Sequence, residues 1–339
     1  MSSDTILLAH GSGGRMTHDL IGEVFLRHFE NSLLAAQDDA AVWVLANPGP
    51  ERIALTTDSY VVSPIFFPGG DIGKLAVCGT VNDLAMVGAT PLYLTAGFIL
   101  EEGLPRADLE RVVASMAAAG REAGVKIVAG DTKVVERGGA DRMFITTAGV
   151  GDVPRGVCIS GANVQPGDVA ILSGPVGVHG IAVMSRREGL EFSFPLQSDC
   201  APLNGLVSEM LKAGGPIHCL RDPTRGGLAT TLNEIAGQSR VEIEIDEALI
   251  PVSEGVRAAC EMLGLDPLYV ANEGKLVAFV TPDAERPVLE AMRGQRYGHE
   301  AAAIGRVASG EPGRVVMNTL FGAHRVLDML SGAQLPRIC

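Results

Sequence analysis

Aspartates stand beside small residues at points where apolar stretches of the sequence end or are interrupted. The stretches are AAQDDAAV, LTTDSYV, GTVNDLAMVGA, VAGDTK and LRDPTRGGL, and they hold Asp38, Asp39, Asp58, Asp83, Asp131 and Asp222. A lone carboxylate is costly to bury, but several carboxylates that converge on Mg²⁺ escape that cost because hard cations bind carboxylate oxygens. A single aspartate of this kind more often caps a turn or a helix. Asp83 fits that explanation least, since it interrupts an otherwise apolar helical stretch.

Three glycine clusters accompany the aspartates: HGSGGR at 10–15, GPVGVHG at 174–180 and RGGL at 225–228. Each is expected to begin a helix, where unpaired N–H groups and the helix dipole bind anions. As motifs they are weak, because turn geometry alone explains most glycine clusters. The Walker loop, the G-x-G-x-x-G loop after a strand, H-E-x-x-H and G-x-S-x-G are all absent from the sequence. A nucleotide would therefore have to be held without the common loops.

Cys339 ends the sequence in LPRIC, where few neighbours are expected to bury its thiol. A thiolate is a nucleophile and oxidises readily, so an exposed thiol is a liability unless it has a use. The tail SGAQLPRIC has glycine, proline and no apolar periodicity, which predicts a mobile segment with almost no apolar surface to bury. The six cysteines lack C-x-x-C and metal-ligand spacing, which indicates reduced thiols of a cytoplasmic protein, most of them in the core.

Length and charge limit the class of protein. A chain of 339 residues is long enough that two domains are the default expectation. The 40 acidic residues exceed the 27 basic ones and give a net charge of −13, which argues against nucleic acid or an anionic membrane as a partner. The start MSSDTILLAHGSGG has no signal-peptide pattern. The longest uncharged run, 84–100, contains Pro91 and is short for a membrane span.

Alternating helix and strand patterns predict an α/β layer structure. Helices are predicted near 17–28, 71–87, 106–123, 203–213, 226–237, 252–263 and 284–293, and in GPVGVHGIAVMS. Strands are predicted at AVWVL, RIALTTD, 92–100, KIVAG, RMFITTAGVG, VAILSG, VEIEID, KLVAFV and VVMN, with the first two joined as a hairpin. The pattern restarts after turn-rich stretches at 151–168, which predicts an N-terminal domain over 1–155, a C-terminal domain over 156–328 and a flexible tail over 329–339.

Taken together, several stretches resemble one family. They are AHGSGGR, DDAAV, the run from TTDSYVV to TPLYL, GDTKVV, GDVAILSGPVGVHGIAVMS, DPTRGGLATTLNEIA, NEGK and PRIC. From about residue 6 to residue 339 the chain resembles the HypE family of hydrogenase maturation proteins. The final PRIC is highly specific to that family. The aspartates alone indicate only the wider PurM-like superfamily, which includes aminoimidazole ribonucleotide synthetase, selenophosphate synthetase and thiamine-phosphate kinase.

The resemblance implies two PurM-like α/β domains, and a homodimer in which two N-terminal half-barrels close into one β-barrel. ATP is expected in the cleft between the domains, with Mg²⁺ between its phosphates and the aspartates. A separate carbamoyltransferase, HypF, is expected to deliver a carbamoyl group to Cys339. ATP then phosphorylates the carbamoyl oxygen, and loss of phosphate leaves a thiocyanate. The cyanide is expected to pass to iron on a HypC–HypD scaffold and to become a ligand of the [NiFe] hydrogenase centre.

The resemblance also implies roles for particular residues. Cys339 is the expected acceptor thiol, Lys133 the expected counter-charge for the phosphoryl oxygens, and Glu273 the expected base for the carbamoyl nitrogen protons. ATP is expected to contact His10, Gly11, Gly13, Gly14, Asp39, Asp58, Asn82, Asp83 and Asp131, and Mg²⁺ is expected to bind Asp39, Asp58, Asp83 and Asp222. The choice of Asp39 over Asp38 as a metal ligand stays open.

Two other classes of function fit the same residues. A kinase or synthetase of the same superfamily would act on a free small molecule, but this reading leaves Cys339 without a role. A selenophosphate synthetase would also be expected to carry cysteine or selenocysteine in its glycine loop, and HGSGGR has neither. A non-catalytic carrier would bind nucleotide and only present the modified thiol to partners. ATP hydrolysis that depends on carbamoylated Cys339 separates the enzyme from the carrier.

Overall fold

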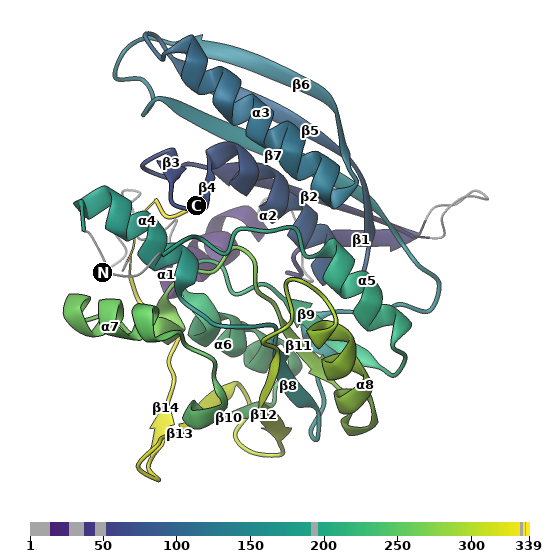
Figure 1. Cartoon of the computed structure of the whole chain (residues 1–339). Helices are drawn as coiled ribbons and strands as arrows, with labels where there is room; N and C mark the ends of the chain where they lie inside the picture. The colour runs from purple at the N-terminus through teal and green to yellow at the C-terminus, as the bar shows by residue number, and fades with distance from the viewer. Residues whose placement is uncertain (1–13, 27–36, 45–51, 191–195, 333–334, 336) are drawn as a thin grey trace.

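Two large sheets, one from each half of the chain, organise the structure (Figure 1). It is a computed structural model, and it describes residues 14–26, 37–44, 52–190, 196–332, 335 and 337–339. Helices pack on both sheets, so the expected α/β class is confirmed. His10, Gly11 and Gly13 lie outside the described residues.

The N-terminal sheet has five strands in the order β1-β2-β7-β5-β6. They are β1 (Ala41–Val44), β2 (Arg52–Tyr60), β7 (Met143–Val153), β5 (Thr90–Glu101) and β6 (Lys126–Val135). Strands β5 and β6 are parallel, whereas β1–β2, β2–β7 and β5–β7 are antiparallel, which confirms the predicted β1–β2 hairpin. Strand β6 forms one edge of this sheet, and its residues 126–134 are all exposed in the single chain. A bare edge of this length is a surface for pairing with another strand.

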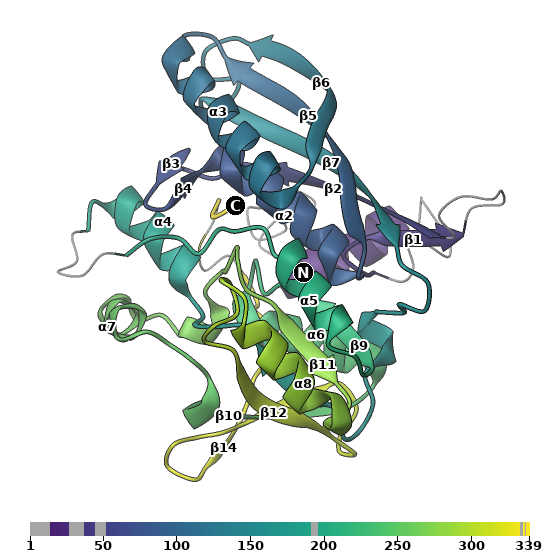
Figure 2. The same cartoon turned by 45° about the vertical axis from the view of Figure 1, so that its right-hand side comes forward.

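Helices α2 (Ile72–Met86) and α3 (Arg106–Ala123) lie together on the N-terminal sheet, close to their predicted bounds (Figures 1 and 2). The Asp71 side chain begins α2 by accepting hydrogen bonds from the amides of Gly73 and Lys74. Almost all of α2 is buried, because it contacts the sheet, α3 and elements of the C-terminal half. Its position between the domains explains why the sequence of α2 is apolar on every side.

The smaller N-terminal elements complete this half. The predicted helix at 17–28 is a short α1 (Arg15–Leu20) that continues into a wider π-helical turn, η2 (Ile21–Leu26). Strands β3 (Phe66–Phe67) and β4 (Gly70–Asp71) form a small antiparallel pair that was not predicted.

The C-terminal sheet has seven strands in the order β14-β13-β10-β12-β8-β11-β9. They are β14 (His324–Val326), β13 (Arg314–Asn318), β10 (Glu242–Asp246), β12 (Ala302–Ala308), β8 (Val169–Leu172), β11 (Val277–Val280) and β9 (Ile217–Arg221). Strands β10 and β13 are parallel and the other neighbours are antiparallel. The sequence patterns predicted β8, β10, β11 and β13 but missed β9, β12 and β14.

Both faces of this sheet are covered by helices. Helix α6 (Gly227–Ser239) packs on one face, and α5 (Asn204–Lys212) and α8 (Pro282–Arg293) pack on the other. Strand β8 divides its side chains between the two cores: Ala170 and Leu172 face α6, and Val169 and Ile171 face α5 and α8. Helices α4 (Val178–Glu188) and α7 (Glu254–Leu263) pack against each other at the side. Single-turn helices are η4 (Gly161–Asn163), η5 (Glu247–Leu249) and η6 (Pro267–Tyr269).

The end of the chain differs from its sequence-based expectation. We expected residues 329–339 to form a flexible tail with little apolar surface to bury, but the described tail residues are docked on the N-terminal domain. The amide of Val61 donates to a main-chain oxygen of Cys339, and the amide of Ser63 donates to the carbonyl oxygen of Arg337, both at 3.2 Å. Ile338 is only 3% exposed and joins the N-terminal core. Both views place the C-terminus near β4 and α4 (Figures 1 and 2).

Two further features bear on the class of protein. All six cysteines lie in the described residues and are free, with Cys78, Cys200, Cys219 and Cys260 buried, as expected for most of them. No helix in the described part of the chain has both the length and the apolar character that a membrane crossing requires.

Candidate active site

Three carboxyl groups from both halves of the chain, Asp222 buried and Asp39 and Asp83 half-buried, meet between the two sheets. Asp39 precedes β1, Asp83 lies in α2, and Asp222 follows β9. Burial is the main cause that raises the pKa of each group: to about 6 for Asp39, to about 8 for Asp222, and well above the usual value for Asp83. Asp58 is half-buried near the end of β2, and its charge raises the pKa of Asp83 and Asp222 further. A divalent cation would remove this mutual repulsion.

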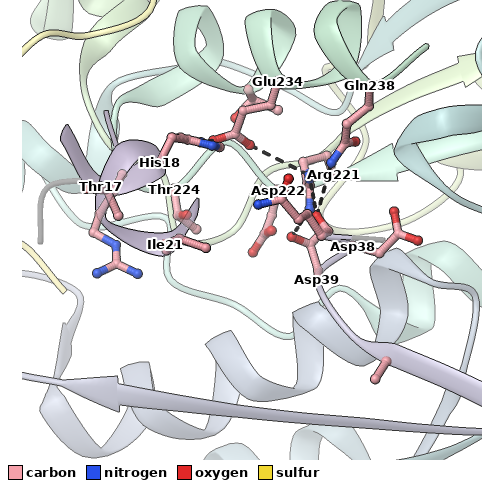
Figure 3. A pocket seen from close by; sticks show the side chains of 14 residues that line it. Thr17, His18, Ile21, Asp38, Asp39, Arg221, Asp222, Thr224, Glu234 and Gln238 are labelled. Carbon is pink, nitrogen blue, oxygen red and sulfur yellow. Dashed lines mark hydrogen bonds and ion pairs between the residues drawn. The ribbon is translucent and has the colours of Figure 1, made fainter. Parts of the chain in front are cut away.

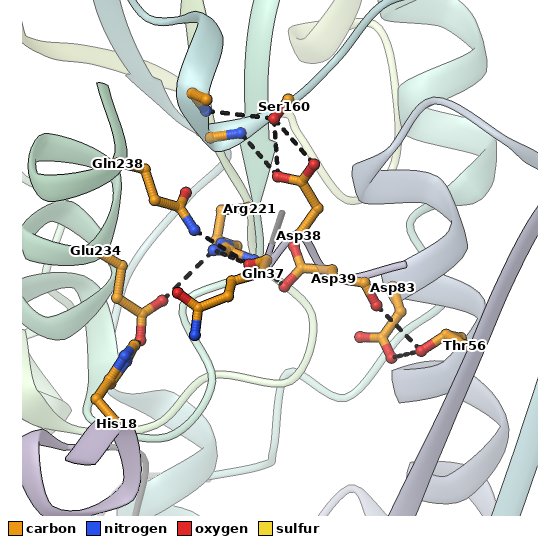
Figure 4. A network of polar contacts seen from close by, with 12 residues as sticks. His18, Gln37, Asp38, Asp39, Thr56, Asp83, Ser160, Arg221, Glu234 and Gln238 are labelled. Atoms are coloured by element: carbon orange, nitrogen blue, oxygen red, sulfur yellow. Dashed lines mark hydrogen bonds and ion pairs between the residues drawn. The ribbon is translucent and has the colours of Figure 1, made fainter. Parts of the chain in front are cut away.

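Thr56 joins two members of this cluster. Its hydroxyl lies 2.8 Å from Asp83 Oδ2 and 3.1 Å from the carbonyl oxygen of Asp39 (Figure 4). A hydroxyl has one proton, so it cannot donate fully to both oxygens. A protonated Asp83 carboxyl supplies the second proton, in agreement with its raised pKa.

A buried arginine compensates part of the negative charge. Arg221 Nη1 pairs with Asp39, and Arg221 Nη2 lies 3.7 Å from Glu234 Oε2 (Figure 4). Glu234 also accepts from His18 Nε2 at 2.8 Å, and this hydrogen bond raises the pKa of His18. The network therefore ties α1 to α6 and holds Asp39 in place.

The structure separates the roles of the two adjacent aspartates. Asp38 accepts from the Ser160 hydroxyl at 2.9 and 3.0 Å and from the Gly161 amide at 3.0 Å, so it holds the start of η4 (Figure 4). Asp39 instead faces Arg221, and its charge raises the pKa of Asp83 and Asp222. This arrangement favours Asp39 over Asp38 as a metal ligand.

A cavity of about 380 Å³ opens beside the cluster (Figure 3). Its walls come from the start of the chain, from the segment before β1, from the loop after β9 and from α6: Thr17, His18, Ile21, Gln37, Asp38, Asp39, Ala41, Arg221, Asp222, Thr224, Arg225, Thr231, Glu234 and Gln238. The volume is within the range of small-molecule sites. Basic and acidic side chains on the same wall suit a phosphorylated ligand that is bound together with a cation.

The docked tail brings Cys339 to the same cluster. Burial raises the pKa of the Cys339 thiol, Arg225 opposes that rise, and the charges of Glu273, Asp58 and Asp222 add to it. Arg225 lines the 380 Å³ cavity and also a small space beside Leu335 and Ile338. The thiol is therefore within electrostatic range of these carboxylates and of a guanidinium that lines both the cavity and the space beside the tail.

Glu273 is buried near the thiol, in the loop before β11. Its Oε1 atom has no hydrogen-bond partner among the described residues, and burial raises its pKa well above the usual value. Asp199 holds the loop: its Oδ1 accepts from the Glu273 amide at 3.1 Å, and its Oδ2 lies 3.3 Å from Lys275 Nζ. A buried carboxyl group with a raised pKa and a free oxygen is suited to proton transfer.

Lys133 and Asp131 lie elsewhere in the single chain. They pair with each other at 2.7 Å on the exposed β6 edge, where their side chains are 71% and 69% exposed. Neither contacts the carboxylate cluster within the described residues. Within one protomer, Lys133 and Asp131 therefore lie outside the candidate site. The residues that the fold does bring together there are Asp39, Asp58, Asp83, Asp222, Glu273 and Cys339.

Two predicted ATP contacts have other partners here. The Asn82 amide is fully buried: it donates to the Ala201 carbonyl at 3.1 Å and accepts from the Leu203 amide at 2.8 Å, so it clamps α2 to the C-terminal half. Gly14 precedes α1, and a Cβ on it would lie 1.9 Å from the Leu330 carbonyl oxygen. Both positions are explained by close packing between the two halves.

Magnesium fits the chemistry of the cluster, although the carboxylates are not drawn together around one point. In the described part of the chain, no group of three or more His, Cys, Asp or Glu side chains is arranged to hold a metal ion. The donors are nevertheless of the type that Mg²⁺ prefers, and their pKa values are raised first by burial and then by the charges of neighbouring carboxylates. Because Mg²⁺ is usually held by one or two carboxylates together with substrate phosphates, a preformed cage is not required.

Sequence reasoning missed the basic residues of the site. Arg221 and Arg225 flank Asp222 in LRDPTRGGL, and His179 lies in GPVGVHG, but these stretches were considered for aspartate and glycine alone. Two arginines within three residues of a candidate metal ligand are a signal for anion binding. His179 gave no such signal, because its partners are distant in the sequence.

Known proteins resemble the chain over its full length. Residues 37–153 match the N-terminal domain, and residues 165–318 the C-terminal domain, of AIR synthase related protein. The carbamoyl dehydratase HypE of Azotobacter vinelandii is 56% identical over 339 residues, which cover 100% of this chain and 98% of that relative.

Solved structures agree with this relationship. A crystal structure of a HypE–HypF complex has a TM-score of 0.87 and 52% identity, and the match covers 92% of this chain and 99% of that one. A crystal structure of the hydrogenase maturation protein HypE in complex with ATP has a TM-score of 0.83 and 54% identity, with 99% and 100% covered. The resemblance inferred from the sequence motifs is confirmed: the chain belongs to the HypE family of carbamoyl dehydratases, built from two AIR synthase related domains.

Proposed function

We propose that this protein uses ATP to dehydrate an S-carbamoyl group on Cys339 to a thiocyanate, and so supplies cyanide for the iron of [NiFe] hydrogenase. One observation carries the proposal most strongly: the charges of Arg225, Glu273, Asp58 and Asp222 act on the Cys339 thiol, and Arg225 lines both the 380 Å³ cavity and the space beside the docked tail. A nucleotide in that cavity would lie next to a group on the sulfur. The relative crystallised with ATP supports a nucleotide ligand.

The reaction needs two steps. An amide oxygen is a poor leaving group, so it first takes the γ-phosphoryl group of ATP, which is consumed as substrate and leaves as ADP. The carbamoyl nitrogen loses one proton as the phosphorylated imidate forms. It then loses its second proton as the C–O bond breaks, phosphate departs, and the carbon–nitrogen triple bond of Cys–S–C≡N forms. The net change is the loss of the elements of one water molecule from the thiocarbamate. The same water is accounted for by the conversion of ATP to ADP and phosphate. Positioning and charge neutralisation are what phosphoryl transfer requires of the protein.

The chain's own residues have separate tasks in this scheme. Glu273 takes a proton from the carbamoyl nitrogen, because its raised pKa makes its carboxylate a stronger base than a solvated one. Arg225, between cavity and tail, neutralises charge on the phosphorylated oxygen. Asp39, Asp58, Asp83 and Asp222 would hold Mg²⁺, which supplies Lewis-acid neutralisation of the phosphates when it is bound.

Lys133 and Asp131 act in this proposal from a second copy of the chain. The exposed β6 edge is the surface for a homodimer, in which the two N-terminal sheets close into a barrel. Each protomer would then present Lys133 toward its partner's nucleotide. Asn82 and the loop that contains His10, Gly11, Gly13 and Gly14 remain predicted parts of the ATP site.

The partners follow from the chemistry of the tail. HypF would carbamoylate Cys339, as the HypE–HypF complex of a relative supports. A HypC–HypD scaffold would receive the cyanide on its iron. We place the protein in the cytoplasm, where the four buried free cysteines stay reduced.

Intact mass spectrometry tests the reaction directly. The protein is incubated with HypF and carbamoyl phosphate, and then with Mg²⁺ and ATP. We expect Cys339 to gain one carbamoyl group and then to lose one water, with ADP and phosphate released in the second stage. A carbamoylated protein that binds ATP but keeps its carbamoyl group would support a carrier instead.

A further inference from the structure

We propose that His179 is a positioning residue that fixes the docked tail so that Cys339 faces Glu273; this inference rests on the proposed function. His179 lies at the start of α4 and is fully buried. Its Nε2 atom lies 2.8 Å from the carbonyl oxygen of Ile338, the residue before the acceptor cysteine. Its Nδ1 atom lies 2.8 Å from the Ser198 hydroxyl.

The hydrogen-bond partners determine which nitrogen carries the proton. Burial lowers the pKa of His179, so the ring is neutral and has one N–H. The Ile338 carbonyl can only accept, so Nε2 must donate to it. Nδ1 then accepts from the Ser198 hydroxyl, which itself accepts from the Cys200 amide at 3.1 Å. The Ile338 carbonyl therefore sets the tautomer, and Ser198 supplies a donor to the other ring nitrogen.

The ring is also held against rotation. Phe67 packs edge-on to His179, with ring centroids 5.3 Å apart and an angle of 88° between the planes. A bond from a fixed ring to a main-chain oxygen restrains the position of the tail without depending on tail side chains. The next residue along the tail carries the thiol.

The start of α4 is also hydrogen-bonded to the segment that carries Glu273, the proposed base. The Gly177 amide donates to Asn272 Oδ1 at 2.7 Å, and the Gly180 amide donates to the Ala271 carbonyl at 3.0 Å. A Cβ at Gly180 would lie 2.4 Å from Val270 Cγ1, so glycine permits this close approach. Glu273 directly follows Asn272. The start of α4 thus holds the tail on one side and the Glu273 loop on the other, which fixes the distance between thiol and base.

The experiment measures carbamoylation of the Cys339 thiol separately from dehydration of the carbamoyl group on it. Carbamoylation happens on HypF and does not need the docked tail, whereas dehydration does. We expect His179→Leu to slow single-turnover dehydration of purified carbamoyl-protein about tenfold or more, the effect of losing one positioning hydrogen bond. Carbamoylation by HypF should stay within about twofold of wild type. His179→Gln, which keeps a donor of similar reach, should restore part of the dehydration rate.

Limited trypsin digestion measures docking of the tail independently of dehydration activity. The Arg337–Ile338 bond is covered in the docked tail, because the Arg337 carbonyl accepts from Arg187 Nη2 at 2.7 Å and from the Ser63 amide. His179→Leu should speed cleavage at this bond, as judged by loss of the last two residues in the intact mass. Ser198→Ala should do the same to a smaller extent, and it keeps the buried ring if His179→Leu does not fold.

A matched control and the opposing outcomes complete the experiment. His218→Gln alters another hydrogen-bonded histidine, which pairs with Asp168 at 2.8 Å and does not contact the tail, and it should change neither readout. Wild-type dehydration and wild-type trypsin resistance in both His179→Leu and Ser198→Ala would overturn the positioning role, and so would equal loss of carbamoylation and dehydration. If the wild-type carbamoyl-protein itself fails to dehydrate, the proposed function is wrong, while the trypsin rates still decide whether His179 holds the tail.

Discussion

Asp222, which follows strand β9 in the C-terminal half, raises the pKa of Asp83, which lies in helix α2 of the N-terminal half. The two carboxyl groups come from different halves of the chain and meet because α2 packs against β9 and α5. The proposed metal and nucleotide site is therefore assembled by the contact between the two halves.

Asp83→Asn should keep the fold and abolish ATP turnover. Asparagine has nearly the same shape and can still bond to Thr56, but it removes the negative charge that would bind Mg²⁺. At neutral pH the variant should be as stable as wild type or more stable, because it no longer contains a buried carboxyl group that resists ionisation. Calorimetry of Mg²⁺–ATP binding, an ATPase assay and a thermal melt measure the three effects.

Asp152→Asn is a suitable control for this change. Asp152 is a half-buried aspartate of β7 in the same sheet, opposite Ile53 and away from the carboxylate cluster. It should bind Mg²⁺–ATP as wild type does. Unchanged Mg²⁺–ATP affinity and turnover in Asp83→Asn would rule out a ligand role for Asp83.

The metal-free protein should lose stability as the pH rises from about 4 to about 8. The pKa values of Asp39 and Asp222 are about 6 and about 8 in the folded protein, against 3.8 for an aspartate carboxyl group free in water. A carboxyl group with a raised pKa binds its proton more tightly in the folded state, so this stabilisation is complete below the unfolded pKa and is lost as the pH passes the folded pKa. Melting temperatures measured across this range without divalent metal give the slope.

Mg²⁺ should make that slope shallower, because it binds the ionised carboxylates of the folded protein only. Asp222→Asn should flatten the slope without metal and weaken the effect of Mg²⁺. A wild-type melting temperature that rises steadily over this pH range, or one that Mg²⁺ does not change at about pH 8, would contradict the assignment of these carboxylates to a metal site.

Charges placed on the β6 edge should split the homodimer. Val128 and Val134 are 57% and 67% exposed on this strand. The double variant Val128→Glu, Val134→Glu should have the mass of a monomer in light scattering at micromolar concentration. It should also lose most ATP turnover, because Lys133 and Asp131 would no longer reach a partner's nucleotide.

Val326→Glu makes the same change on β14, the edge of the other sheet, where Val326 is 47% exposed. That control should stay dimeric and active. If wild type is itself a monomer, or if the double variant is a fully active monomer, the proposed barrel across two chains is wrong.

Most of the regular elements could be predicted from local patterns. Helix α3 has the predicted bounds because an apolar stripe runs from Arg106 to Ala123 and Gly124 ends the helix in a left-handed conformation. Strands β9, β12 and β14 escaped prediction for a physical reason. Their sequences IHCLR, AAIGRVA and HRV mix polar and small residues, and their strand conformation comes from pairing with neighbours that are distant in the sequence.

The acidic residues of the site could be predicted from the sequence, but their contacts could not. Aspartates in apolar surroundings are visible in the sequence, and in the fold the charges of Asp39 and Asp222 act on Asp83. The partners of these acids depend on tertiary packing. Arg221 reaches Asp39 across 182 positions, and Arg337 reaches the Val61 carbonyl across 276. A tail that docks through main-chain bonds leaves no periodic pattern in its own sequence, which is why residues 329–339 were expected to be flexible.

The last prediction concerns the thiol and the length of the tail behind it. Cys339→Ala should leave dimerisation and ATP binding unchanged and should lower stability by about 1 kcal/mol or less, because the side chain is only half-buried. It should nevertheless abolish carbamoylation and cyanide formation. Cys339→Ser should fail as well, because a hydroxyl is a far weaker nucleophile at neutral pH and an oxygen–cyanide adduct would not release cyanide in the same way.

Deletion of residues 331–334 keeps the thiol and shortens the reach of the tail by roughly 13 Å. The segment before the deletion is held, since the Arg15 amide donates to the Leu330 carbonyl at 2.9 Å, so the tail cannot easily slide to compensate. The variant should fold and bind ATP, accept a carbamoyl group more slowly, and dehydrate it slowly or not at all.

Ile338→Ala is the matched comparison: it keeps the full length but removes buried apolar contact, so it should weaken docking and slow dehydration while carbamoylation continues. Intact mass after each stage distinguishes the variants. Full cyanide production by the shortened chain would show that reach is not limiting, and a cyanated product at another cysteine in Cys339→Ala would show that the acceptor is not Cys339.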